Sequence, residues 1–81
     1  MERLELFHAI HDENSARVRR VIVEHDLTER IVFRNVFYDQ GQADLLARGG
    51  SSPPALWTGD RLIVGANAIV DYLRGLVATE P

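Results

Sequence analysis

Two segments with the residue pattern of β-strands are separated by a segment of helical pattern, and this arrangement constrains the fold most strongly. Residues Leu4–Ile10 alternate loosely between apolar and polar side chains, and Ile31–Tyr38 is rich in β-branched and aromatic residues. Between them, from about Glu13 to His25, apolar residues recur at helical spacing. A strand joined through a helix to the next strand of its sheet lies parallel to it. We therefore predict a parallel β-α-β unit in the first half of the chain.

The second half of the chain continues with a short helix, a hairpin and a final helix. Asp39–Ala47 is predicted to be the short helix, ending close to Gly49, because glycine readily adopts the left-handed conformation that caps helices. Ala55–Trp57 and Arg61–Val64 flank a turn and are predicted to form an antiparallel hairpin. An apolar stripe predicts the final helix over about 66–76. The order β-α-β-α-β-β-α predicts an α/β domain with a mixed four-stranded sheet and helices on both faces.

Length and composition exclude several classes of protein. The chain has 81 residues, enough for one domain, which we predict over 1–77 with a C-terminal tail at 78–81. It contains no cysteine, which excludes disulfides and thiolate-bound metals. The net charge of −3 argues against a nucleic-acid or anionic-membrane partner. Because there is no signal-peptide pattern and no long apolar run, we expect a cytoplasmic protein that binds neither nucleic acid nor membrane.

Two stretches of the sequence carry a family resemblance. The first is Leu6-Phe7, four residues, and then Asp12-Glu13-Asn14-Ser15-Ala16-Arg17-Val18. It is similar to the glutaredoxin pattern of a strand ending in Leu-Tyr, four residues, Cys-Pro-Tyr-Cys, a basic residue and Val. The second stretch, 54–73, is similar to the cis-proline strand, hairpin, glycine and Ala-Ile-x-x-Tyr-Leu helix of the same family. The chain thus resembles glutaredoxins and the N-terminal domain of glutathione transferases. The resemblance implies a thioredoxin-like fold of glutaredoxin type, with a cis peptide bond before Pro54.

The sequence departs from this family at the two positions that carry its chemistry. Asp12 stands where the family has its nucleophilic cysteine, and Ser15 stands where it has the resolving cysteine. An aspartate can cap the helix but cannot attack a disulfide. A serine hydroxyl needs a positioned base to become a nucleophile, and the sequence offers no obvious one. We therefore expect no catalytic residue at these former active-site positions.

The groove that the family uses for glutathione has partial counterparts here. In the family, the residue before the cis-proline pairs with the backbone of glutathione, but Pro53 has no N–H to donate. The backbone N–H groups of Ala66 and Asn67, at a helix N-terminus, can still meet a carboxylate. We expect no cofactor and only weak binding of glutathione. The candidate ligand-binding residues are Asp12, Glu13, Asn14, Pro53, Pro54, Ala66 and Asn67.

One cluster of polar residues has the composition of a metal site. It consists of His8, His11, Asp12 and Glu13. A strand and the loop after it rarely bring such residues together, and structural zinc takes four ligands, so we expect no metal site. The two acidic residues are adjacent at a helix start, which favours capping over paired acid–base chemistry.

Two further features are expected to be structural. Arg17, Arg19 and Arg20 are predicted to form the solvent-exposed face of the first helix rather than a phosphate or RNA site. Trp57, on a hairpin strand, is predicted to pack against the sheet rather than to hold a ligand.

Three functional hypotheses remain open from the sequence. The leading one is a redox-inactive glutaredoxin-like module that binds a peptide, a partner protein or a small thiol metabolite through the inherited groove. The second is a glutathione-dependent oxidoreductase or transferase that uses Ser15 or Asp12 unconventionally. The third is a purely structural or interaction domain. The missing cysteines favour a protein that is not an enzyme.

Overall fold

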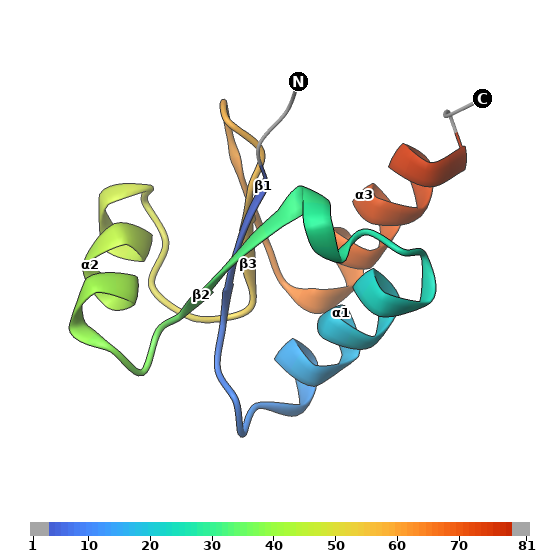
Figure 1. Ribbon diagram of the computed structural model, residues 1–81. Coiled ribbons are helices and arrows are strands. Elements are labelled where there is room, and N and C mark those ends of the chain that lie inside the picture. The colour runs from blue at the N-terminus through green and yellow to red at the C-terminus, as the bar shows by residue number, and fades with distance from the viewer. Residues whose placement is uncertain (1–3, 79–81) are drawn as a thin grey trace.

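The computed structural model describes residues 4–78 and shows an α/β domain built from four strands, three α-helices and one 3-10 turn. The sequence predicted this class and the order of its strands and α-helices. Figure 1 shows the elements, which are β1 (Leu4–His8), α1 (Glu13–Glu24), η1 (Thr28–Arg30), β2 (Ile31–Asn35), α2 (Asp39–Ala47), β3 (Ala55–Trp57), β4 (Leu62–Val64) and α3 (Ala66–Ala78).

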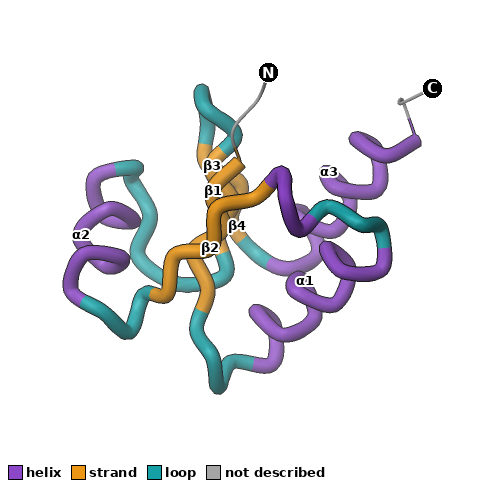
Figure 2. The backbone as a smooth tube through the Cα atoms, in the orientation of Figure 1, coloured by secondary structure: helices purple, strands orange, loops and turns teal. Residues whose placement is uncertain are grey.

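The four strands, orange in Figure 2, form one mixed sheet. Their order in the sheet is β2-β1-β3-β4. β1 and β2 are parallel, with Leu4 opposite Ile31, which confirms the predicted β-α-β pairing. β3 is antiparallel to both of its neighbours. Its Ala55 lies opposite Phe7 of β1 and opposite Val64 of β4. The carboxyl ends of β1 and β4 and the amino end of β3 therefore meet at one edge of the sheet.

The helices cover the two faces of the sheet unequally. In Figure 1, α1 and α3 lie together on one side of the strands, and α2 lies alone on the other. The face under α1 and α3 holds the main core, because alternate residues of the strands and the apolar stripes of both helices meet there. This core contains Leu4, Leu6, Val18, Val21, Ile22, Leu27, Ile31, Leu56, Ile63, Ala66, Ile69, Val70 and Leu73.

The face under α2 combines a small apolar cluster with buried charge. Phe7, Leu45 and Ala55 are its buried apolar residues. Glu5 projects to this face and is only 8% exposed. Its carboxylate accepts from Arg34 Nε at 2.6 Å and from Arg48 Nη2 at 3.2 Å.

Trp57 and Arg48 connect the buried Glu5 carboxylate to the small apolar cluster on the α2 face. Trp57 packs against the apolar cluster, as predicted, and the Arg48 guanidinium lies 4.6 Å from the centroid of its ring. Because Arg48 ends α2 and Glu5 lies in β1, these contacts attach the C-terminus of the helix to the centre of the sheet.

The first two strands end earlier than predicted. β1 ends at His8 rather than Ile10, and β2 ends at Asn35 rather than Tyr38. The Asn35 side chain accepts a hydrogen bond from the Phe37 backbone N–H at 2.9 Å. Such a local bond turns the chain out of the strand, although the aromatic residues beyond it favour strand structure.

The remaining boundaries differ from the prediction by one or two residues. The hairpin strand begins at Leu62 rather than Arg61, and α1 ends at Glu24 rather than His25. α3 continues past residue 76 to Ala78, the first residue of the predicted tail. The rest of that tail, 79–81, lies outside the described residues.

Candidate functional site

The residues at the two positions that the resemblance aligns with cysteines stabilise the start of α1. Asp12 is the N-cap, and its Oδ2 accepts from the Ser15 backbone N–H at 2.7 Å and from the Ser15 hydroxyl at 2.8 Å. Ser15 Oγ in turn accepts from the Ala9 backbone N–H at 3.1 Å. A carboxylate is therefore placed to take the hydroxyl proton, but Ser15 is fully buried and a substrate has no access to it. This arrangement is suited to holding the loop after β1 against the helix.

The predicted groove residues come together at one edge of the sheet. Asp12 follows β1, Pro54 precedes β3, and Asn67 lies in the first turn of the helix after β4. The Gly65 backbone N–H donates to the Pro54 carbonyl at 3.1 Å, which joins two of these segments. The Pro53-Pro54 peptide bond is cis, as the resemblance implied.

The groove residues differ in what they present to solvent. Glu13, Asn14 and Asn67 are exposed, whereas Pro54 and Ala66 are buried. A ligand at this edge would therefore meet the backbone of the buried pair and the side chains of the exposed residues.

Arg17 adds a contact that the sequence did not indicate. Its guanidinium donates to Asn67 Oδ1, so a side-chain hydrogen bond joins the second turn of α1 to the first turn of α3. This bond keeps a positive charge beside the N-terminus of α3. The edge thus carries a cation from Arg17 and carboxylates from Asp12 and Glu13.

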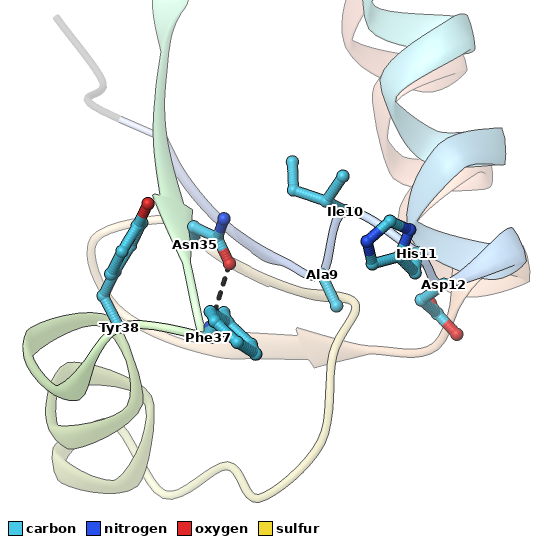
Figure 3. Close-up of a pocket in the computed structure, with 7 residues that line it drawn as sticks. All are labelled: Ala9, Ile10, His11, Asp12, Asn35, Phe37 and Tyr38. Atoms are coloured by element: carbon cyan, nitrogen blue, oxygen red, sulfur yellow. Dashed lines mark hydrogen bonds between the residues drawn. The ribbon is translucent and has the colours of Figure 1, made fainter.

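A pocket of about 510 Å³ lies next to this edge, between the loop that follows β1 and the loop that follows β2 (Figure 3). Only Asp12 belongs both to the pocket and to the predicted groove. The lining residues are Ala9, Ile10, His11, Asp12, Asn35, Phe37 and Tyr38. Sequence reasoning missed this pocket because it placed Ile10, Phe37 and Tyr38 in strands.

The side of the pocket formed by Phe37 and Tyr38 is held by close backbone packing. The Asn35 side chain fixes the Phe37 N–H, and the Tyr38 N–H donates to the Asn35 carbonyl at 3.3 Å. Gly41, in the first turn of α2, packs so closely that a Cβ built there would lie 2.2 Å from the Asn35 carbonyl oxygen. Glycine is therefore required for this turn of α2 to approach the end of β2.

The opposite side of the pocket is held by Arg19. Its guanidinium donates to the Ala9 carbonyl at 3.0 Å and to the Ile10 carbonyl at 3.2 Å. Arg19 is half-buried, so the prediction that it belongs to the solvent-exposed face of the helix is wrong. The Ala9 and Ile10 carbonyls accept these hydrogen bonds because they lie beyond the end of β1, where no neighbouring strand donates to them.

His8 completes the contacts of Arg19. Arg19 Nη1 lies 3.1 Å from His8 Nδ1, which can accept from it only when that nitrogen carries no proton. Burial first, and the neighbouring Arg19 guanidinium second, lower the pKa of His8 below its usual value. His8 also makes an edge-to-face contact with Phe33, with 5.7 Å between the ring centroids.

No family model and no curated protein matches the chain.

Residues 4–78 were compared with two patterns, a metal-ligand cluster and a membrane-spanning helix. Within them, no three His, Asp or Glu side chains are grouped so as to hold a metal ion. His8 and His11 diverge, because His8 packs with Arg19 and Phe33 while His11 lines the pocket. None of the helices described here is long and apolar enough to cross a bilayer.

Proposed function

We propose that this chain is a thioredoxin-like module of glutaredoxin type that has no redox chemistry and binds a ligand with a peptide backbone. That ligand is a segment of a partner protein or a small peptide thiol. The observation that carries the proposal is the meeting of Asp12, Pro54 and Asn67, from three separate segments, at one edge of the sheet. Ligands of α/β sheets commonly bind at such an edge, beyond the strand ends.

The use of Asp12 and Ser15 as a helix cap supports binding over catalysis. Thiol–disulfide exchange passes through a mixed disulfide, which requires a cysteine that the chain does not contain. Ser15 is buried and bonded on both sides, so an enzyme that uses this hydroxyl is disfavoured.

Charge and backbone chemistry at the edge argue against tight binding of glutathione. Asp12 and Glu13 place negative charge where an anionic ligand would dock, while Arg17 and the N–H groups at the start of α3 offer a partial site for a carboxylate. Pro53 can accept a backbone hydrogen bond but cannot donate one. A peptide without net charge should therefore bind more tightly than glutathione.

The test is an amide NMR titration of isotope-labelled protein with reduced glutathione and, separately, with a capped neutral tripeptide, acetyl-Ala-Val-Ala-amide. We expect the amides of Ser52, Ala66 and Asn67 to shift together, with saturation only in the millimolar range. If none of these amides shifts up to the solubility limit of either probe, the groove proposal fails. Measurable turnover of a glutathione mixed disulfide by the purified chain would contradict the absence of redox chemistry.

A variant that restores the missing donor makes this test sharper. Pro53→Ala returns a backbone N–H before Pro54, and one hydrogen bond contributes about 0.5–1.5 kcal/mol net. The tripeptide should then bind about 2- to 12-fold more tightly. Ser51→Ala, in the same loop, is the matched control and should leave its affinity unchanged.

A further inference from the structure

The pocket beside the groove exposes apolar side chains to an unusual extent. Phe37 is 85% exposed, Tyr38 is 67% exposed and Ile10 is 55% exposed, and all three line the pocket. Phe7, by contrast, is fully buried in the same small domain. Large apolar side chains that gather around a hollow mark a binding site more often than isolated ones do.

The two aromatic rings present faces in different directions. The ring centroids of Phe37 and Tyr38 lie 6.2 Å apart, and the ring planes are at 78° to each other. Figure 3 shows both rings on one side of the pocket, with Ile10, His11 and Asp12 on the other. Two nearly perpendicular aromatic rings in a pocket that an aspartate also lines are components of a site for an organic cation, because the face of an aromatic ring attracts positive charge.

The pocket lining includes a carboxylate. Asp12 lines the pocket, and the exposed Glu13 and Asp39 follow the two lining segments directly in the chain. Arg19 contacts the same loop through the Ala9 and Ile10 carbonyls, but it is not among the residues that line the pocket. The lining itself therefore holds one carboxylate, that of Asp12, and no arginine or lysine, which suits a cation.

The hydrogen bonds that Asp12 already makes limit the class of cation that this pocket can bind. Asp12 Oδ2 already accepts two hydrogen bonds from Ser15, so Asp12 cannot offer both oxygens to a guanidinium fork. A quaternary ammonium group needs no hydrogen-bond acceptor and gains from ring faces and net negative charge alone. We propose that this pocket binds a quaternary ammonium group, carried either by a small molecule or by a trimethylated lysine side chain.

The experiment is an amide NMR titration at about pH 8, where free histidine is neutral. Choline is compared with dimethylbutanol, the uncharged molecule in which carbon replaces the choline nitrogen. We expect the amides of Ile10, His11, Phe37 and Tyr38 to shift, with choline binding about tenfold more tightly than the neutral molecule. A peptide with a trimethyllysine at its centre is the second arm, and tighter binding of this peptide than of choline assigns the ammonium group to a protein partner.

Three substitutions separate the contributions of an aromatic ring, of the Asp12 charge and of overall net charge to the binding of choline. Phe37→Leu keeps an apolar side chain but removes a ring face, so it should weaken choline and leave the neutral molecule unchanged. Asp12→Asn should do the same, because asparagine retains the N-cap while the charge is lost. Asp71→Asn makes the same change of net charge on the exposed face of α3 and should have no effect. Equal affinity for the charged and the neutral molecule, or no shift with saturating choline, would overturn the proposal.

Discussion

The two faces of the sheet are built on different principles. In the described part of the chain, the face under α1 and α3 buries thirteen apolar residues in one continuous cluster. The face under α2 buries three apolar residues, together with a carboxylate that binds two arginines. Apolar burial is non-directional, whereas hydrogen-bonded charges specify geometry. The first face therefore provides most of the stability, and the second fixes the position of α2 and of the pocket side attached to it.

The largest difference between the two faces is expected from a substitution at Ile22, which is fully buried between α1 and the sheet. Ile22→Ala should lower the free energy of unfolding by about 2–5 kcal/mol, because it removes buried methyl groups and leaves a cavity. Since a domain of this size gains only about 3–5 kcal/mol from its core, the variant should be largely unfolded. Urea denaturation measures the effect. The neighbouring Val23→Ala, at an exposed position, should cost little, and equal losses from the two variants would refute the assignment of the core.

A smaller effect is expected at Gly41 on the α2 side. Gly41→Ala places a Cβ against the Asn35 carbonyl oxygen, so α2 must shift, at a cost of about 1–3 kcal/mol. Gly75→Ala in α3 meets no atom within 4 Å and should instead stabilise the protein by about 0.5–1 kcal/mol. Thermal and urea unfolding of the two variants check this opposite sign. A stabilising Gly41→Ala would show that α2 does not pack closely on the end of β2.

The ion pairs of Glu5 under α2 should contribute less to the free energy of unfolding than the close packing at Gly41. Glu5→Gln removes the charge that binds Arg34 and Arg48, whose side chains are 36% and 38% exposed and can turn to water. We expect a loss of about 1–2 kcal/mol. Hydrogen exchange should show faster opening of α2, with α1 and α3 less affected. A uniform rise in exchange across all three helices would mean that Glu5 stabilises the whole domain rather than the position of α2.

The smallest expected effect is a pH dependence on the α1 side. Because His8 has a lowered pKa in the folded protein, the folded state resists its protonation more than the unfolded state does. This contribution to stability is complete above the unfolded pKa of about 6.5 and is lost as the pH falls from there through the lowered folded pKa. His8→Gln should flatten this part of the profile of unfolding free energy against pH. An unchanged profile would exclude His8 as its source.

Periodicity in the sequence was enough to predict the order of the elements and their approximate limits. It succeeded because the apolar stripes of α1 and α3 and the short strands all contribute to one core. The capping role of Asp12 was also predictable, since an aspartate before a helical pattern is a common N-cap.

The pocket could not be predicted because it depends on where β2 ends and on contacts between segments that are distant in the chain. Phe37 and Tyr38 have strand-forming side chains, and only the Asn35 hydrogen bond reveals that the strand has already ended. Arg19 has the spacing of a solvent-facing residue, yet it binds loop carbonyls ten and nine positions earlier. The burial of Glu5 depends on arginines from β2 and from the end of α2.

The bond between Asp12 and Ser15 limits how such a chain could acquire thiol chemistry. Asp12→Cys alone would remove the cap of α1, at a cost of about 0.5–2 kcal/mol. It would also take the acceptor from the buried Ser15 hydroxyl, and an unsatisfied buried group costs about 1–3 kcal/mol. We therefore expect the two positions to be epistatic, with a cysteine at 12 costing less stability together with a change at 15. A small domain with a thin stability margin has few single-step routes to a reactive thiol at this position.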